Sequence, residues 1–131
     1  MTNEIERQRV SIKGIFRRDG KFLLLRQPDD FWELPGGGLE LGESIGACFA
    51  REIAEELGWP GVQTGQVVHA WARTSRDGKI QYVLIAITAE ASDKPIVLSA
   101  EHIESGWFSL PEIKTMKIRS ASIIDAIQKV I

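Results

Sequence analysis

The sequence lacks the features that mark secreted, membrane-bound and strongly nucleic-acid-binding chains. Cys48 is its single cysteine, so no internal disulfide can form, which suits a reducing compartment. No apolar run approaches the roughly 18 residues that a bilayer span requires, and the polar stretch from Met1 to Gln8 has no apolar signal core. The formal net charge of −2 gives no general attraction to polyanions. We therefore expect a cytoplasmic protein without a membrane partner, and we do not expect nucleic acid as a partner.

Internal repeats, low-complexity tracts and linker-like stretches are also absent. A length of 131 residues suits one domain and is enough to bury a core without staples. The hydrophobic share of 44% and the charged share of 26% are ordinary for a globular chain. We therefore expect a single domain over residues 1–131.

Apolar segments separated by turn residues predict six strands. Asp19-Gly20 and Asp77-Gly78 are typical of hairpin turns, because glycine accepts the positive φ that such turns need. The segment from Ile80 to Ile87 is too apolar for an edge strand, so we place it centrally. The predicted strands are Val10 to Phe16, Phe22 to Leu25, Phe31 to Leu34, Gln66 to Arg73, Ile80 to Ala89 and Gly106 to Phe108.

Two segments predict helices, Glu43 to Leu57 and Ile118 to Val130. In the first, an apolar stripe recurs every four residues, and Gly58 is a natural C-terminal stop. The stripe consists of Ile45, Phe49, Ile53 and Leu57. We read Pro35 to Gly38 as a glycine-rich loop and Leu110 to Ile113 as a turn. The element order β-β-β-α-β-β-β-α predicts an α+β fold, a mixed sheet flanked by helices in an α/β/α-like sandwich.

The first predicted helix carries three glutamates at positions i, i+3 and i+4: Glu52, Glu55 and Glu56. That spacing places the carboxylates on one face, opposite the apolar stripe. Like charges so spaced repel one another unless a divalent cation lies between them, and Mg²⁺ prefers such oxygen ligands. A glutamate-rich helix face alone is most often only solvated surface, so the neighbouring residues decide the interpretation.

The longer pattern from Gly37 to Trp59 supplies that context. Five residues separate Gly37 from Glu43, seven separate Glu43 from Arg51-Glu52, and the glutamates are followed by Gly58 and a bulky apolar residue. This resembles the signature of the Nudix hydrolases, G-x5-E-x7-R-E-U-x-E-E-x-G-U, at every fixed position. Trp59 stands where the family more often has Ile, Leu or Val. The resemblance covers the box directly, and the order of the flanking elements extends it to a Nudix fold.

The resemblance implies a hydrolase of a nucleoside diphosphate linked to another moiety X, with water attacking phosphorus. Mg²⁺ is the implied cofactor, for which Mn²⁺ can substitute. The implied metal ligands are Glu52, Glu55, Glu56 and the carbonyl of Gly36. The implied general base is Glu52 or, as in MutT-like members, a glutamate before a late tryptophan, which is Glu101 here. Gly37, Glu43, Arg51 and Gly58 take structural roles, with Arg51 pairing with Glu43.

Three residues outside the box are candidates for binding the substrate. Arg26 can hold a phosphate and Trp32 can stack on a base, although a surface arginine and a core tryptophan are equally open. Tyr82, on the central strand, fits either a pocket or a packed core. We read His69 and His102 as structural or surface residues and Cys48 as a small apolar filler.

Two other functions stay open. A catalytically silent Nudix domain would bind a nucleotide as a regulator or interaction module, although such members usually lose a box glutamate that this chain keeps. An RNA 5′-triphosphate substrate would need a basic patch. The marks of ADP-ribose, dinucleoside polyphosphate, NADH and coenzyme A subgroups are missing, which favours a small MutT-like enzyme acting on a small nucleotide-type diphosphate. A homodimer is a family tendency.

Overall fold

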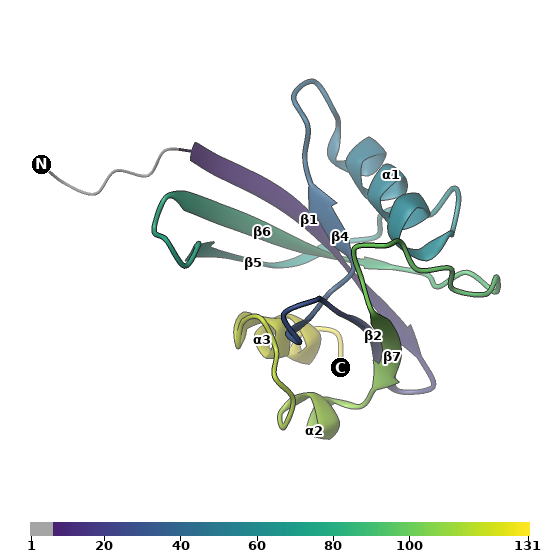
Figure 1. The fold of residues 1–131 in the computed structure, drawn as a ribbon. Helices are drawn as coiled ribbons and strands as arrows, with labels where there is room; N and C mark the ends of the chain where they lie inside the picture. Colours follow the sequence, from purple (N-terminus) through teal and green to yellow (C-terminus); the bar gives the residue numbers. More distant parts are fainter. Residues whose placement is uncertain (1–6) are drawn as a thin grey trace, which may run out of the picture.

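The computed structural model describes residues 7–131, so most of the stretch from Met1 to Gln8 lies outside the described residues. The strands are β1 (Arg7–Arg18), β2 (Lys21–Arg26), β3 (Trp32–Glu33), β4 (Gly36–Gly38), β5 (Val67–Thr74), β6 (Ile80–Ala89) and β7 (Glu104–Phe108), and the helices are α1 (Ile45–Leu57), α2 (Leu110–Ile113) and α3 (Ser122–Gln128). The strand order is β3-β2-β1-β6-β5, with β4 pairing with β1 and β7 with β2 (Figure 1). Within this described part, no helix has the length and apolar character needed to cross a membrane.

The long strand β1 joins two parts of the sheet. Its residues Arg7 to Phe16 run parallel to β6, while Ser11 to Lys13 pair antiparallel with β4 on the other side. Its end pairs with β2 through a tight turn, in which Asp19 and Gly20 both have positive φ, as a two-residue hairpin requires. The predicted first hairpin is therefore confirmed, and β1 passes from one part of the sheet to the other.

Strand β6 lies inside the sheet, between β1 and β5, as the sequence predicts. It pairs antiparallel with β5, and the turn between them contains Gly78 at φ +77°. Asp77 stabilises this turn by accepting hydrogen bonds from the Ser75 hydroxyl and the Lys79 N–H. The predicted second hairpin is therefore confirmed as well.

Helix α1 begins two residues later than predicted. The Ser44 hydroxyl caps it by accepting a hydrogen bond from the Ala47 N–H, and Gly58 ends it in the left-handed conformation. The predicted stripe is buried at Phe49, Ile53 and Leu57, but the prediction is wrong at its first member, because Ile45 is 41% exposed. The first turn of α1 therefore lies beyond the hydrophobic cluster against which the rest of the helix packs.

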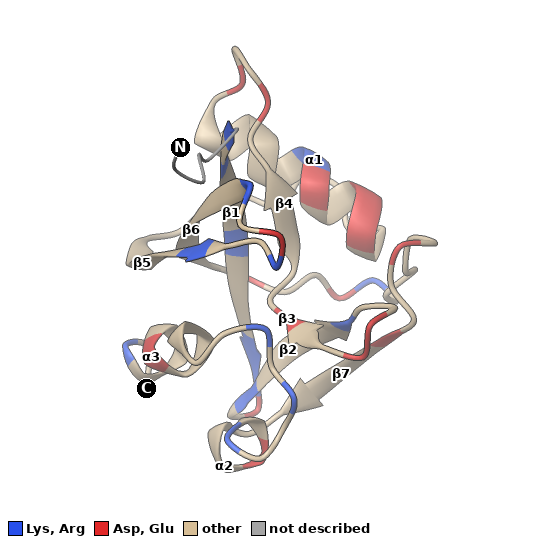
Figure 2. Cartoon of the chain, turned by 60° about the vertical axis from the view of Figure 1, so that its left-hand side comes forward, with Lys and Arg blue, Asp and Glu red and all other residues tan. Residues whose placement is uncertain are grey.

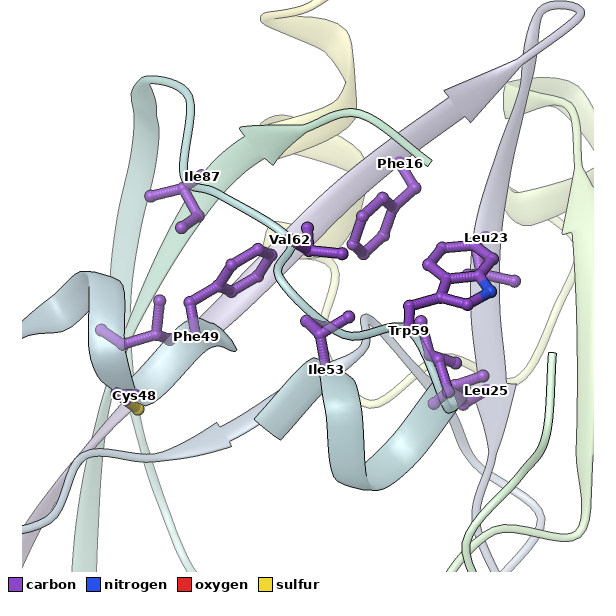
Figure 3. Packing of buried hydrophobic residues seen from close by; sticks show 11 residues of the cluster. Phe16, Leu23, Leu25, Cys48, Phe49, Ile53, Trp59, Val62 and Ile87 are labelled. Atoms are coloured by element: carbon purple, nitrogen blue, oxygen red, sulfur yellow. The ribbon is translucent and has the colours of Figure 1, made fainter. Parts of the chain in front are cut away.

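Alternate residues of β1 and β2 point to opposite sides of the sheet and build two hydrophobic clusters. The first cluster packs α1 and Trp59 against β1 and β2 (Figure 3). The Trp59 indole N–H donates to the carbonyl of Lys94 at 2.9 Å. The second cluster packs α2 and α3 against the other side, where Ile15 and Leu24 are buried. Helices therefore cover both faces, and the predicted mixed sheet flanked by helices is confirmed.

Three local predictions are wrong, each for an identifiable reason. The glycines at 36–38 form β4 rather than a loop, because β1 offers them a hydrogen-bonding edge. Residues 110–113 form helix α2 rather than a turn, because Ser109 and Glu112 make a capping box. The last helix spans only Ser122–Gln128, and Ile118 instead forms an isolated bridge with Trp32.

Candidate active site

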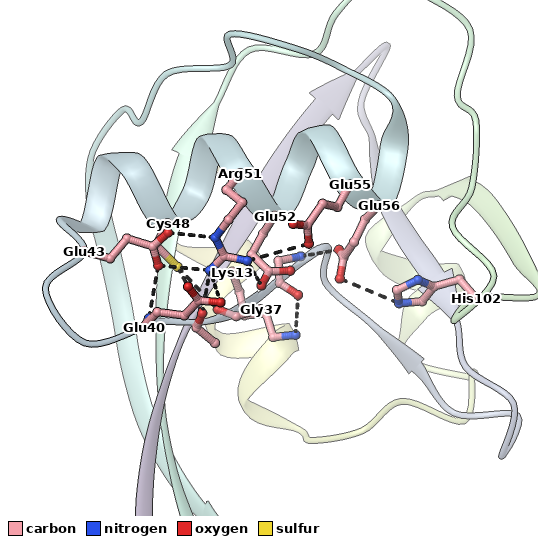
Figure 4. Close-up of polar contacts among 12 residues, drawn as sticks. Lys13, Gly37, Glu40, Glu43, Cys48, Arg51, Glu52, Glu55, Glu56 and His102 are labelled. Atoms are coloured by element: carbon pink, nitrogen blue, oxygen red, sulfur yellow. Dashed lines mark hydrogen bonds and ion pairs between the residues drawn. The ribbon is translucent and has the colours of Figure 1, made fainter.

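Arg51 ties helix α1 to the chain that precedes it. Its Nε and Nη2 donate to the two carboxylate oxygens of Glu43 at 2.7 and 2.9 Å, and its Nη1 donates to Glu52 Oε1 at 2.9 Å. Nη2 also donates to the carbonyl of Gly38 at 3.0 Å. Figure 4 shows the Arg51 guanidinium between the side chains of Glu43 and Glu52. Hydrogen bonds from Arg51 lower the pKa of Glu43 to about 2, and those to Glu43 and Glu52 raise the pKa of Arg51. The expected pairing of Arg51 with Glu43 is present, and the same guanidinium orients Glu52.

Glu52 lies directly against the backbone of β4. A Cβ built at Gly37 would stand 2.4 Å from the carboxyl carbon of Glu52, so glycine alone leaves room for this carboxylate. Burial raises the pKa of Glu52, and the hydrogen bond from Arg51 opposes that rise. The structural role expected for Gly37 therefore has a direct cause, which is the close approach of Glu52.

Glu56 has the most buried carboxylate on α1, with the residue 6% exposed. Its Oε1 accepts a hydrogen bond from the Gly36 N–H at 2.7 Å, and its Oε2 lies 4.0 Å from Nε2 of His102. Burial raises the pKa of Glu56 to about 7, against the lowering effects of the Lys13 ammonium and the Gly36 hydrogen bond. The expectation of three glutamates on a face pointing away from the packed side is wrong for Glu56, because β4 contacts that part of α1.

A cavity of about 520 Å³ opens beside these carboxylates. Segments far apart in the sequence line it: Gln27, Pro28 and Asp29 after β2, Gly36, Gly37 and Gly38 of β4, Glu52 and Glu56 of α1, Glu101 and His102 before β7, and Arg119 before α3. In Figure 2 the acidic positions of α1 appear as adjacent red bands on one side of the helix. The cavity thus brings together five of the residues named from the sequence, Gly36, Gly37, Glu52, Glu56 and Glu101.

Glu55 and Gly58 lie outside the cavity lining, as Glu43 and Arg51 do. The side chain of Glu55 is 59% exposed, and its Oε2 lies 3.6 Å from Arg51 Nη1. Gly58 has φ +69° and donates its N–H to the Ala54 carbonyl, which is the helix-ending role expected of it. Glu55 therefore differs from Glu52 and Glu56 in being solvated at the rim of the cluster.

The three residues suggested for substrate binding are placed elsewhere. Arg26 donates to Asp30 at 2.6 Å and to Glu104 at 2.8 Å, so its guanidinium already has two carboxylate partners. The ring of Trp32 packs edge-on against Phe108, with 5.0 Å between centroids, at the second cluster. The Arg73 guanidinium covers the ring of Tyr82 at 4.5 Å. Arg26, Trp32 and Tyr82 do not line the 520 Å³ cavity, and their roles in binding stay predictions.

Three side chains near the carboxylates carry no local sequence signal. We expected His102 to be a structural or surface residue. Its side chain is only 7% exposed, and burial lowers its pKa. Arg119 donates to Asp29 Oδ1 at 2.8 Å and to Gln27 Oε1, and its guanidinium covers the Phe31 ring at 4.6 Å. Lys13 donates to the Gly36 carbonyl at 3.3 Å. Only the folded chain brings these side chains to β4 and α1, so no short motif could reveal them.

The donor atoms of the cavity fit a hard divalent cation. The carboxylates of Glu52 and Glu56 and the carbonyl of Gly36 are oxygen ligands of the kind that Mg²⁺ takes. Burial raises the pKa of both carboxylates, and a cation between them would favour their ionised forms. Within residues 7–131, no three His, Cys, Asp or Glu side chains are grouped as a finished metal site.

Comparisons with known proteins agree with this arrangement. A family model described as "NUDIX domain" matches residues 6–127. The nucleoside triphosphatase NudI of Enterobacter sp. (strain 638) is 27% identical over 139 residues, covering 94% of this chain and 97% of that protein. A MutT-like protein of Streptomyces ambofaciens is 30% identical over 122 residues, covering 90% of this chain and 76% of that protein. The similarity therefore extends well beyond the box.

Solved structures show the same architecture. The MutT protein from Methanosarcina mazei Go1 superposes with a TM-score of 0.81 at 27% identity, covering 94% of this chain and 92% of that one. A NUDIX hydrolase from Nitrosomonas europaea superposes with a TM-score of 0.80 at 24% identity, covering 93% and 87%. At 24% identity, the likeness to the Nitrosomonas europaea structure concerns the fold alone. Both superpositions match the mixed sheet flanked by helices.

Proposed function

This chain belongs to the NUDIX domain family and is a pyrophosphohydrolase, and from that premise we propose that it hydrolyses a nucleoside diphosphate linked to another moiety X with the help of a divalent cation. The observation that carries the proposal is the meeting of Glu52, Glu56 and the Gly36 backbone at one cavity. The proposed ligands are Glu52, Glu55, Glu56 and the Gly36 carbonyl. We propose Mg²⁺ as the cation, with Mn²⁺ as a substitute.

The chemistry follows from the charges at the cavity. When bound, the cation would neutralise the diphosphate oxygens and make a water more acidic. The water oxygen then forms a bond to phosphorus while a P–O bond of the diphosphate breaks, and the leaving phosphate keeps the electron pair. A carboxylate of the cavity takes the proton from the water. Arg51 holds Glu52 in place by its hydrogen bond of 2.9 Å throughout.

Two carboxylates at the cavity are candidates for this proton transfer, Glu52 and Glu101. Glu52 is held by Arg51 and by contact with Gly37, whereas Glu101 is exposed on the loop that also carries His102. A general base can be replaced by glutamine with loss of kcat and retention of metal affinity, whereas replacing a metal ligand weakens metal binding. Comparing the Mn²⁺ Kd and kcat of Glu52→Gln and Glu101→Gln therefore separates the two roles.

We propose nucleoside triphosphates as the first substrates to test. The NudI relative, which the chain matches over 97% of its length, is named a nucleoside triphosphatase. The same cavity is lined by Gln27, Asp29 and Arg119. Arg119 can donate hydrogen bonds to the polar edge of a base or ribose, Asp29 can accept them, and Gln27 can do both. A small nucleotide fits a cavity of about 520 Å³, a usual size for a small-molecule site.

The test measures the release of phosphate and pyrophosphate from a panel of nucleotides with Mg²⁺ or Mn²⁺. We expect metal-dependent turnover by the wild-type chain and a loss on the order of 100-fold or more in kcat for Glu56→Gln. The matched control is Glu90→Gln, which removes an exposed glutamate outside the 520 Å³ cavity and should leave kcat unchanged. Turnover with a chelator present, or equal rates in both variants, would contradict the proposal.

The alternative is a regulator that binds a nucleotide without hydrolysing it. Under that alternative, nucleotide binding would be measurable by calorimetry while no member of the panel turned over with either metal. Homodimer formation also stays a prediction, and sedimentation of the purified chain tests it.

A further inference from the structure

Lys13 is a buried cation beneath the carboxylates. It lies in the middle of β1, directly opposite Gly36 of β4, and the residue is only 8% exposed. Its Nζ donates to the Gly36 carbonyl at 3.3 Å. Long ammonium side chains rarely occupy such positions without a compensating charge. The side chain is therefore held inside the protein rather than reaching into solvent.

The groups near Lys13 are those of the proposed metal site. Its positive charge stabilises the ionised forms of Glu56 and Glu52 and disfavours protonation of His102. Glu56 accepts from the N–H of Gly36 while Lys13 donates to the carbonyl of that residue. The backbone of Gly36 thus lies between an anion and a cation supplied by the chain itself. Figure 4 shows Lys13 and Glu56 in the same cluster of polar side chains.

We propose that Lys13 is an internal counter-ion that competes with the divalent cation for the Gly36 carbonyl and weakens metal binding at Glu52 and Glu56. The inference rests on the proposed metal site and adds a residue that the box does not contain. The ammonium occupies the carbonyl oxygen that a cation would use, and like charges at such short range repel strongly in a poorly solvated site. Lys13 also stabilises the metal-free state by partly neutralising the buried carboxylates.

If Lys13 is such a counter-ion, removing its charge should have opposite effects on the metal-free and the metal-bound protein. Without metal, Lys13→Met leaves Glu56 without its buried cation, so the melting temperature should fall. With metal, the same variant should bind Mn²⁺ at least about tenfold more tightly than the wild type, because one repelling charge has gone. A lysine that served only as packing would lower the melting temperature without tightening Mn²⁺ binding.

The experiment measures the Mn²⁺ Kd by electron paramagnetic resonance under oxygen-free conditions. A pH of about 8.5 keeps Glu56 ionised, since its pKa is about 7. The matched control is Lys21→Met, which removes an exposed lysine at the first hairpin and should leave the Kd unchanged. Should Lys13→Met not fold, Lys13→Gln tests the effect of the charge, because its amide can still donate to the Gly36 carbonyl. Lys13→Arg keeps the charge and should keep the weak wild-type Kd.

The outcomes separate this inference from the proposed function. Tighter Mn²⁺ binding by Lys13→Met or Lys13→Gln, together with an unchanged Lys21→Met, supports the inference. Equal or weaker binding by the uncharged variants overturns it and leaves the metal site standing. Absence of Mn²⁺ binding by the wild type and by every variant overturns the proposed metal site, and the inference falls with it.

Discussion

Glu56 links the proposed chemistry to the stability of the metal-free protein. Its pKa of about 7 in the folded chain lies above the ordinary value of 4.5, so the folded state binds the proton more tightly than the unfolded state. This contribution to the free energy of unfolding is therefore fully present below about pH 4.5 and is lost as the pH rises through about 7. At about 1.4 kcal/mol per pKa unit, the loss is on the order of 3 kcal/mol.

Urea unfolding in the presence of a chelator, at about pH 5 and about pH 8, measures this contribution. His102 acts in the opposite direction, because its lowered pKa makes stability rise with pH. The comparison is therefore between the wild type and Glu56→Gln, which should lack the loss at high pH. Parallel pH profiles for the two proteins would show that Glu56 is not the responsible group.

Cys48 is predicted to be chemically inert in the folded chain. It is fully buried on α1, and burial, followed by the nearby Glu43 charge, raises the pKa of its thiol from 9.0 to about 11. The reactive thiolate is then roughly 100-fold scarcer at neutral pH, in addition to the steric block. A disulfide exchange reagent should label Cys48 only after urea unfolding. Rapid labelling under native conditions would mean that α1 opens readily from the first cluster.

At the scale of elements, β4 is the strand on which the site depends. Gly36 has φ +134°, and a Cβ there would stand 2.0 Å from the Ile12 carbonyl oxygen, whereas at Gly37 it would meet only the flexible end of Glu52. We therefore expect Gly36→Ala to lower the free energy of unfolding by at least about 2 kcal/mol. Gly37→Ala should stay within about 1 kcal/mol of wild type but displace Glu52 and lower kcat on the order of 100-fold.

Urea unfolding and the nucleotide assay together test this contrast between neighbouring glycines. Gly46→Ala is the matched control, since a Cβ in that part of α1 meets nothing within 4 Å. It should stabilise the helix by roughly 0.5 to 1 kcal/mol and leave kcat unchanged. Equal stability losses at Gly36 and Gly37 would show that the Glu52 carboxylate cannot move aside.

The sequence predicts those elements whose local pattern matches their environment. The hairpin turns at Asp19 and Asp77 were predictable because the Asp-Gly pair of each turn favours the turn conformation by itself. Strand β4 was not, because consecutive glycines have poor strand propensity and only the edge of β1 makes them extended. The Ser109 capping box was a readable signal for α2, but Pro111 and the short length suggested a turn.

The residues of the proposed active site show the same limit of prediction from sequence. Helical spacing places Glu52, Glu55 and Glu56 on one face, yet their exposure differs because β4 covers only part of α1. Spacing within one helix cannot reveal which neighbour packs against it. Arg119 lies 90 residues from Asp29 along the chain, so their ion pair at 2.8 Å depends wholly on tertiary structure. The box and Glu101 could therefore be read from the sequence, whereas Gln27, Asp29 and Arg119 on the opposing wall of the cavity could not.

At the scale of the whole molecule, β1 couples the two hydrophobic clusters. Ile12 and Phe16 belong to the cluster under α1, while Ile15 belongs to the cluster under α3. Neither cluster can lose its packing without exposing a strand that the other needs. The proposed active site lies where β1, β4 and α1 meet, so its carboxylates depend on the same strand.

We therefore expect the chain to unfold in one cooperative transition, as a single domain over residues 1–131 would. Phe49→Ala in the first cluster and Ile127→Ala in the second should each lower the free energy of unfolding by roughly 2 to 5 kcal/mol, because both side chains are fully buried. In each variant, tryptophan fluorescence and far-UV circular dichroism should report the same urea midpoint. Leu41→Ala, at a fully exposed position, should change the free energy of unfolding by less than about 0.5 kcal/mol.

The two probes distinguish coupling through β1 from independent packing of the two clusters. If the clusters were independent, Ile127→Ala would unfold the second cluster, against which Trp32 and Trp71 pack, at a lower urea concentration than the first cluster, which contains Trp59, so the fluorescence transition would split in two. If β1 couples them, loss of packing beneath α3 also releases Glu52 and Glu56 on the opposite side of the sheet. Saturating Mn²⁺ would then raise the midpoint of Ile127→Ala as much as that of Phe49→Ala, because the cation binds only the fully folded chain.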